Sequence, residues 1–360
     1  IHHFEIWNGP DQRVALDWVD AETANLRAGF RWSVEQGDLD RATEIAAHTA
    51  MLTRILQRYE AVGWAEEILE AASAVHTAQL PRLYTAASLC SYIGRPEAAI
   101  GYAQQAQTLE EDRRYDSFES GWSHFWEATA NLYLGQIEPA IEIFTELAEG
   151  SGLGHVNGMC GLLYTFPAIG RAAEARAIAD ETVEAARGYG NPIWIAFALN
   201  GYGRAFSETD PARALKALRE GLEYSREHRL AFFEALAARD AAALEAVHGD
   251  FDEALTLLDS AVDSFHRAGD RNNVGNTLAA LATFFDRVEQ PTVAATLYGF
   301  TTRYGGIELI TALPGVVANL RSVLGDAGFD EAVAAGADLE PAEAVHYARH
   351  QIQLALARER

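Results

Sequence analysis

The chain is poor in lysine, cysteine and methionine, and it contains no long apolar run. Lys216 is its only lysine, and Leu215 stands where a G-x-x-x-x-G-K-[ST] loop needs glycine, so the chain has no ATPase P-loop. No apolar stretch approaches the roughly 18–20 residues that a membrane helix needs, and no signal-peptide core follows Ile1. The start without methionine indicates a fragment of a longer polypeptide, or a processed one.

The two cysteines, Cys90 and Cys160, are too few and too far apart for a disulfide framework or a cysteine metal site. Their scarcity fits a reducing cytosol, and we expect both thiols to be buried among apolar residues. The sequence therefore predicts a cytoplasmic protein.

The formal net charge is −24, from 28 basic and 52 acidic residues. A surface this negative repels phosphate backbones, so we expect no direct binding to nucleic acid and none to a membrane. Solubility is the simplest meaning of the charge. The alternative is an acidic groove that recruits a basic partner.

A short motif recurs along the chain, in which a turn position precedes an alanine by five residues. From position 94 onward these turns are separated by 41, 35, 39, 40 and 40 residues, a period typical of helical-repeat proteins. The turn positions are Gly37, Gly94, Gly135, Gly170, Thr209, Gly249 and Glu289, and the alanines are Ala42, Ala99, Ala140, Ala175, Ala214, Ala254 and Ala294.

After each turn, apolar residues recur at the spacing of one helix face, as in Ala140, Ile143, Phe144 and Leu147. Alanine at the first of these positions leaves room for two helices to cross closely. A glycine at the turn supplies the left-handed conformation that ends the preceding helix. The pattern predicts antiparallel helix pairs.

The two ends of the chain differ from the repeats. We expect residues 1–12 to be a linker, residues 13–302 to form the helix pairs, and residues 303–360 to form a helical C-terminal cap. An open stack of repeats needs such a cap to cover its last apolar face. Within the cap we expect helices near 314–325, 329–336 and 341–357.

Both ends resemble a known family. Residues 16–48 read LDWVDAETANLRAGFRWSVEQGDLDRATEIAAH, and residues 290–305 and 328–348 read QPTVAATLYGFTTRYG and GFDEAVAAGADLEPAEAVHYA. The segment Asn25–Trp32, together with Gly336 and Glu340–Val345, resembles the carboxy-terminal region of bacterial LuxR-type STAND ATPase transcriptional regulators, some of which carry an adenylyl-cyclase domain. The resemblance implies a sensor region whose partners are an inducer or a protein, and the ATPase domain of the same polypeptide.

Three segments contain residue types found in chemical sites, and each has a simpler interpretation. Gly150–Gly154 lies between helices, where a flexible connection is expected rather than a catalytic loop. His346 and His350 have a zinc-compatible spacing but lack a third ligand. The acidic run from Glu110 to Asp116 also contains arginines, as a solvated surface segment does. We expect no enzyme activity, no cofactor and no metal.

Binding is instead expected on the concave face of the predicted fold, which the first helix of each pair would line. Aromatic, amide and arginine side chains are suited to a peptide or small organic ligand. Packing is the alternative role for the tryptophans, and a shift of one residue would turn groove into core. The candidate ligand- or partner-binding residues are Tyr84, Trp122, Phe125, Asn157, Tyr164, Arg239 and Asn276.

The sequence thus predicts an all-α, right-handed α-α superhelix of tetratricopeptide-like helix pairs with a helical cap. The predicted function is ligand or partner sensing for a bacterial STAND-type transcriptional regulator. The alternative is a free-standing tetratricopeptide scaffold that binds other proteins. A closed α/α-toroid enzyme is a third class, which the open-ended cap disfavours.

Overall fold

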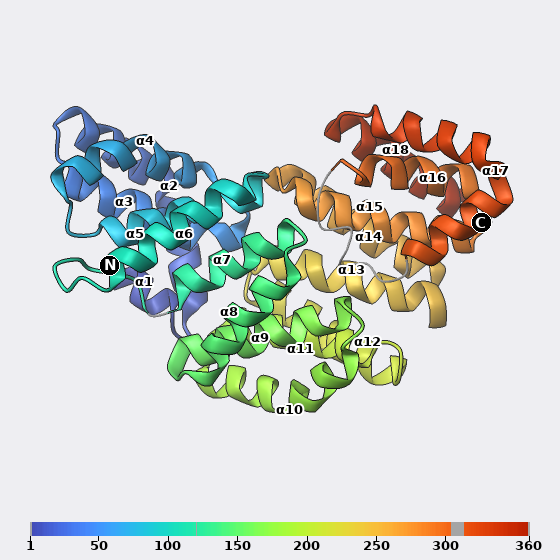
Figure 1. Cartoon of the computed structure of the whole chain (residues 1–360), viewed down its shortest axis with the longest axis horizontal. Helices are drawn as coiled ribbons and strands as arrows, with labels where there is room; N and C mark the ends of the chain where they lie inside the picture. Colours follow the sequence, from blue (N-terminus) through green and yellow to red (C-terminus); the bar gives the residue numbers. More distant parts are fainter. Residues whose placement is uncertain (1, 120, 304–312, 359–360) are drawn as a thin grey trace. The chain divides into compact units, whose positions relative to one another are not determined.

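The computed structural model describes residues 2–119, 121–303 and 313–358, and in these residues it is built from helices alone (Figure 1). Helices make up 84% of the described residues, and these residues form no strand. Consecutive helices pack against each other as adjacent pairs. The predicted all-α fold of tetratricopeptide-like helix pairs is therefore confirmed.

The described residues contain eighteen α-helices and two short 3-10 helices. The first part of the chain contains α1 (His2–Trp7), α2 (Gln12–Glu35), α3 (Leu39–Thr53), η1 (Arg54–Leu56), α4 (Glu60–Val75), α5 (Leu80–Ala87), η2 (Ser88–Ile93), α6 (Pro96–Glu110), α7 (Trp122–Tyr133), α8 (Ile137–Glu149) and α9 (Gly152–Ala168). The remainder contains α10 (Ala172–Tyr189), α11 (Pro192–Phe206), α12 (Pro211–Glu227), α13 (Ala231–His248), α14 (Phe251–Ala268), α15 (Arg271–Arg287), α16 (Pro291–Thr301), α17 (Leu313–Ala337) and α18 (Pro341–Arg358).

Internal contacts divide the chain into two compact units. Unit 1 comprises Ile1–Leu162, Asp180–Ala198 and Tyr224–Ala231. Unit 2 comprises Leu163–Ala179, Leu199–Glu223 and Phe232–Arg360. In unit 1 each helix from α2 to α8 packs on the next, and in unit 2 the same holds from α14 to α17.

The alanine of the repeat motif is buried in every helix pair. All seven of these alanines, Ala42, Ala99, Ala140, Ala175, Ala214, Ala254 and Ala294, are fully buried. A methyl group is the largest side chain that allows two helix backbones to approach this closely. The motif therefore marks the contact that holds each pair together.

The five glycines at the turns before these alanines have the expected backbone conformation with one exception. Gly37, Gly94, Gly135 and Gly170 all have positive φ and end the preceding helix. Gly249 does not, which corrects the prediction for that turn. There the Gly249 amide continues the helical pattern by donating to the Glu245 carbonyl (2.9 Å), and the side chain of Asp250 caps the start of α14 by accepting hydrogen bonds from the amides of Asp252 and Glu253.

The N-terminal segment differs from the linker expected over residues 1–12. Residues 2–7 form helix α1, which packs on α2 and α3 and buries Phe4 and Trp7. The Trp7 carbonyl accepts hydrogen bonds from Gln12 Nε2 (2.9 Å) and Asn191 Nδ2 (2.7 Å). Two buried aromatic rings and a satisfied carbonyl explain why this segment is part of the core of unit 1.

The C-terminal helices cover the last repeats of unit 2. Helix α17 has a non-helical residue at Gly325, which separates the two short helices expected there. Helix α18 packs on α14, α15 and α16, and Arg349 pairs with Asp259 and Asp263 of α14. The predicted bounds of the cap, 303–360, stay a prediction, and residues 304–312 at its start lie outside the described residues.

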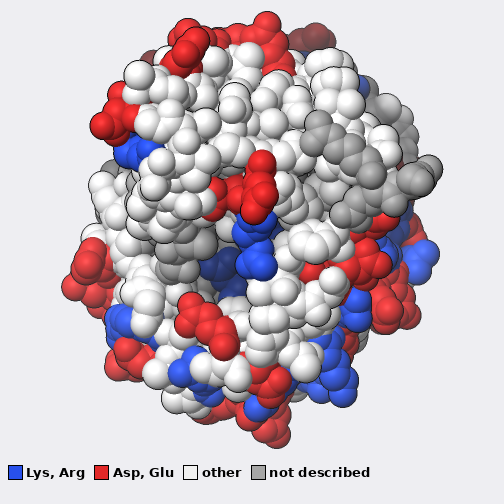
Figure 2. All heavy atoms as spheres, turned by 90° about the vertical axis from the view of Figure 1, so that its right-hand side faces the viewer, with Lys and Arg blue, Asp and Glu red and all other residues white. Residues whose placement is uncertain are grey.

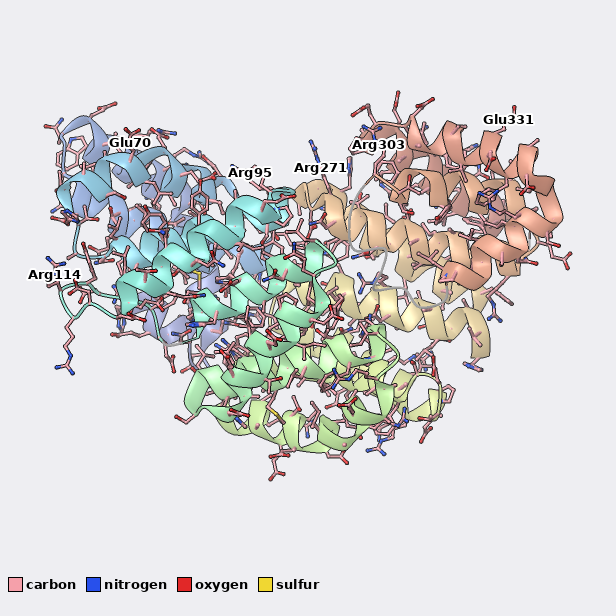
Figure 3. All side chains as sticks on the ribbon, in the orientation of Figure 1. Glu70, Arg95, Arg114, Arg271, Arg303 and Glu331 are labelled. Carbon is pink, nitrogen blue, oxygen red and sulfur yellow. The ribbon has the colours of Figure 1, made fainter. Side chains whose placement is uncertain are left out.

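Charged side chains lie mostly on the surface, where they pair with each other. Figure 2 shows carboxylates spread over the visible face with arginines between them. Arg95, labelled in Figure 3, donates to Glu66 from both Nη atoms at 2.7 and 2.6 Å and so joins α6 to α4. Because such pairs are about half exposed, each contributes at most about 1 kcal/mol.

Helix α17 offers a matched test of close backbone packing. A Cβ at Gly336 would lie 1.8 Å from the Thr296 carbonyl oxygen of α16, whereas a Cβ at Gly315 would meet nothing within 4 Å. We expect Gly336→Ala to lower the free energy of unfolding by about 2 kcal/mol or more, because the helices must separate. Gly315→Ala should change it by less than about 1 kcal/mol. Urea unfolding measures both, and equal effects would contradict the close approach of α16 and α17.

Candidate functional site

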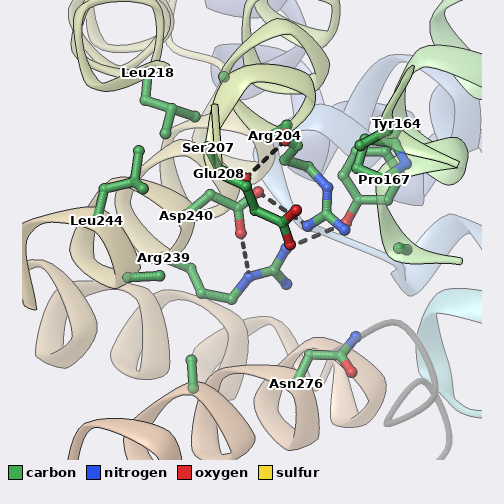
Figure 4. A pocket seen from close by; sticks show the side chains of 15 residues that line it. Tyr164, Pro167, Arg204, Ser207, Glu208, Leu218, Arg239, Asp240, Leu244 and Asn276 are labelled. Atoms are coloured by element: carbon green, nitrogen blue, oxygen red, sulfur yellow. Dashed lines mark hydrogen bonds and ion pairs between the residues drawn. The ribbon is translucent and has the colours of Figure 1, made fainter. Parts of the chain in front are cut away.

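Three of the seven sequence candidates line one cavity in unit 2. Tyr164, Arg239 and Asn276 surround a volume of about 220 Å³, which is hereafter called the unit 2 cavity (Figure 4). Arg204, Asp240, Ser207 and Glu208 add to its polar lining. Pro167, Leu218 and Leu244 supply apolar surface.

The repeat explains why these side chains meet. Tyr164 lies on α9, Arg204 on α11, Asp240 on α13 and Asn276 on α15. Each of these helices is the first of its pair, and their side chains recur at about the period of the repeat. The first helices of four successive units therefore each contribute a side chain to the same cavity.

Asp240 is the centre of a buried ionic network. Its carboxylate accepts hydrogen bonds from Arg239 Nε (2.9 Å), Arg204 Nη1 (3.4 Å) and Asn200 Nδ2 (3.1 Å). Burial acts to raise the pKa of Asp240, but the two guanidinium groups and the Asn200 hydrogen bond outweigh it and lower that pKa. The carboxylate is therefore charged at neutral pH.

Arg239 connects this network to the rest of the cavity wall. The residue is 5% exposed, and it donates to Tyr164 Oη (3.2 Å) and Asn273 Oδ1 (3.3 Å) as well as to Asp240. Burial acts to lower the pKa of Arg239, but the attraction of Asp240 and Tyr164 raises it. Removing either member of a buried pair of this kind leaves an uncompensated charge, which is strongly destabilising.

Two polar atoms of the cavity have no hydrogen-bond partner among the described residues. Arg204 Nε is a buried donor, and the Arg204 guanidinium lies 4.4 Å from the centre of the Tyr164 ring. Asn276 Oδ1 is a buried acceptor. Buried polar atoms are normally satisfied, so the cavity has one donor and one acceptor available for a ligand.

The other four sequence candidates belong to unit 1. Trp122, Phe125 and Asn157 are buried, and the Trp122 ring lies 5.4 Å from the Trp126 ring and 5.5 Å from the Trp194 ring. Tyr84 is half-buried, with its hydroxyl 3.1 Å from Ser73 Oγ. These residues pack in the core of unit 1, and their role in binding stays a prediction.

Sequence reasoning missed Arg204, Asp240 and Arg54. Arg204 and Asp240 were detectable, because they stand about one repeat after Tyr164 and one repeat before Asn276. Arg54 lies in the short 3-10 helix η1, where the helical period is interrupted and the sequence has no corresponding signal. Its surroundings emerge only from the tertiary structure.

The described residues contain little that suits nucleophilic or metal chemistry. Burial raises the pKa of the Cys90 thiol to about 12 and also raises that of Cys160. No three histidine, cysteine or carboxylate side chains of the described ranges are placed to share a metal ion. None of the helices in this part of the chain has the length and apolarity that a bilayer span requires.

Comparison with known proteins identifies a relative in fold but none in sequence. No family model matches the chain, and no curated protein matches it. A solved structure of a Rap protein complexed with competence and sporulation factor is similar over 100% of this chain and 97% of that chain, with a TM-score of 0.57 and 16% identity. At this identity the likeness shows the fold alone. The chain thus shares the helical-repeat fold of a Rap protein.

Asp270 is connected to the cavity residue Arg239 through Asn273. It caps α15 and accepts hydrogen bonds from the backbone amide of Asn273 (3.0 Å) and from Asn273 Nδ2 (2.8 Å). The pKa of Asp270 is raised from 3.8 to about 6, because burial disfavours the charged form more than Asn273 and Arg239 favour it. Asn273 in turn accepts from Arg239, so Asp270 belongs to the same network.

The raised pKa predicts a specific pH dependence of stability. Asp270 contributes stability that is fully present below about pH 4 and is lost as pH rises through about 6. Asp270→Asn keeps a capping side chain without the titration. The free energy of unfolding of the wild type, minus that of the variant, should therefore fall by up to about 3 kcal/mol between pH 4 and pH 7. Urea unfolding at both pH values checks this, and a constant difference would contradict it.

Proposed function

We propose that the chain is a sensing domain that binds a peptide or a similar amide-bearing ligand in the unit 2 cavity. The observation that carries this proposal is the pair of unsatisfied groups, Arg204 Nε and Asn276 Oδ1, in one cavity. A peptide unit has one N–H donor and one carbonyl acceptor, so it complements both groups at once. Such a ligand would repay the cost of their burial.

The size of the cavity favours recognition of part of a ligand rather than the whole. Its volume of about 220 Å³ is smaller than the roughly 300–1,000 Å³ of pockets that enclose a complete small molecule. Apolar surface from Leu218 and Leu244 suits one anchoring side chain. An extended peptide could place one residue in the cavity and its other residues outside.

Binding, rather than catalysis, is also the function that we infer from the fold comparison. The Rap protein of similar fold was solved in complex with competence and sporulation factor, which supports partner binding by a helical-repeat chain of this kind. We propose no cofactor, no metal and no enzymatic step for this chain. The other candidates, Tyr84, Trp122, Phe125 and Asn157, are proposed as secondary contacts in unit 1.

The regulatory setting rests on the sequence resemblance at the two ends. We propose that the domain senses an inducer or a peptide for a bacterial, cytoplasmic STAND-type transcriptional regulator and transmits that state to an ATPase domain of the same polypeptide. A ligand that binds one conformation better than another shifts the equilibrium by that difference in affinity. No direct contact with nucleic acid or membrane is needed for this role.

A free-standing scaffold is the second candidate function. The specific observation in its favour is that this chain covers 97% of the Rap protein chain, so a similar fold is known in which the repeats account for nearly the whole chain. In this alternative the same cavity binds a peptide segment of a partner protein. Co-purification of an ATPase activity with the natural full-length product would distinguish the regulator from the scaffold.

A peptide array tests the proposed binding mode. The probe is a library of N-acetylated, C-amidated pentapeptides, and binding of its best member is measured by fluorescence anisotropy. We expect Arg204→Met and the isosteric Asn276→Leu each to weaken binding about tenfold, because each leaves one group of the peptide unit without a partner.

Arg267→Met is the matched control, because Arg267 is an exposed arginine of unit 2 that pairs with Asp263 within α14. It should leave the affinity within about twofold of the wild type, as expected for a surface ion pair. The proposal fails if no peptide binds the wild type. It also fails if Arg204→Met, Asn276→Leu and Arg267→Met all bind the best peptide equally well.

A further inference from the structure

Arg54 of η1 has surroundings that no other arginine of the described residues shares. It is 4% exposed, and its guanidinium carbon lies 5.0, 4.9 and 4.7 Å from the ring centres of Trp7, Trp122 and Trp126. These three rings are hereafter called the tryptophan cage. All of these residues belong to unit 1.

The Arg54 guanidinium forms no salt bridge within the described residues. Its Nε and Nη2 atoms are buried and have no hydrogen-bond partner there. Burial lowers the pKa of Arg54 to about 10, so the group is still charged at neutral pH. The cage faces attract the cation, but they leave its N–H groups unsatisfied.

The unsatisfied Nε and Nη2 atoms of Arg54 form the edge of the guanidinium that other arginines of this chain use to bind carboxylates. Arg171 donates from Nε and Nη2 to the two oxygens of Glu174, both at 2.6 Å. Arg349 donates from the same two atoms to Asp259 at 2.9 and 3.1 Å. This side-on, two-bond geometry matches a planar carboxylate. Arg54 presents the same edge without the acid.

The cage adds further donors and no acceptors. The indole nitrogens of Trp7, Trp122 and Trp126 are buried and also have no partner among the described residues. Five donor nitrogens of Arg54 and the cage therefore lack an acceptor among the described residues. Buried donors of this number are expected to be matched by an electron-rich ligand group. The surrounding rings select a ligand that is also aromatic or apolar.

Helix α1 forms one wall of the cage, and its residues His3 and Phe4 also line a cavity. Trp7 is the only cage residue that α1 contributes, and it is fully buried. Beneath the same helix lies a separate cavity of about 120 Å³. Among the residues around that cavity are His3, Phe4, Trp18 and His48. To displace this six-residue helix, a ligand must offset the loss of the buried Phe4 and Trp7 contacts and of the two hydrogen bonds to the Trp7 carbonyl.

We propose that Arg54, Trp122 and Trp126 form a binding site for an aromatic carboxylate, and that Trp7 of α1 occupies the position of the ligand's aromatic group. The carboxylate pairs side-on with Nε and Nη2 of Arg54, and the aromatic group replaces the Trp7 ring. Ligand binding thereby releases α1. This site is independent of the unit 2 cavity and of the function proposed for it.

A cavity variant tests the site directly. In Trp7→Gly, N-acetyl-L-tryptophan should bind roughly tenfold or more tightly than N-acetyl-L-tryptophanamide, which has the same ring without the charge. Adding Arg54→Met should abolish this preference. Adding Arg95→Met instead is the matched control, because Arg95 is an exposed arginine of unit 1, and the preference should remain.

Isothermal titration calorimetry measures these affinities, and each of the following outcomes counts against the proposal. Equal affinity for the acid and the amide would mean that Arg54 does not read the carboxylate. Inorganic phosphate that competes as well as N-acetyl-L-tryptophan would assign a general anion site instead. Retention of the preference in Trp7→Gly/Arg54→Met would place the carboxylate elsewhere.

The unmodified chain provides a second measurement if Trp7→Gly does not fold. Hydrogen exchange of the α1 amides is followed with and without N-acetyl-L-tryptophan, with the amide as control. We expect the acid to accelerate exchange in residues 2–7, because the ligand and Trp7 compete for one position. Exchange that is unchanged by the acid, or accelerated equally by the amide, would overturn the proposal.

Discussion

The rest of the structure depends on close packing of the two helices of each pair, within which the alanine of the repeat motif is fully buried. Because the alanine is small, the helices approach closely, and the larger apolar residues one turn further on pack around the contact. Repetition of this contact keeps each new pair in a similar register to the previous one. The same constraint is most severe between α16 and α17, where Gly299 and Gly336 leave no space for a Cβ.

Regular stacking has a direct consequence for binding. Side chains that are one repeat apart in the sequence become neighbours in space, so α9, α11, α13 and α15 each contribute to the unit 2 cavity. A cavity built in this way combines residues that are individually ordinary. Its character arises from the network around Asp240, and among the described residues that line the cavity Arg204 Nε and Asn276 Oδ1 are buried without a hydrogen-bond partner.

The arginines of the chain illustrate how burial changes the role of one residue type. On the surface they join neighbouring helices through exposed carboxylate pairs, which add little stability. Arg54 and Arg204 instead lie against aromatic rings and retain unsatisfied N–H groups. The net charge of −24 does not predict these two environments, because each is determined by the residues around a single guanidinium group.

The sequence by itself determined the fold class, the positions of the paired helices and most of their turns, because a helix face and a close crossing impose a local, periodic pattern on residue types. It also selected Tyr164, Arg239 and Asn276 through their place in the repeat. Only the tertiary structure decided that Trp122 and Phe125 pack in the core of unit 1, and that α1 is part of that core instead of a linker. It alone placed Arg54 among three tryptophans from distant segments. The physical reason is that burial and pairing of a side chain depend on contacts between helices far apart in sequence, which no local period encodes.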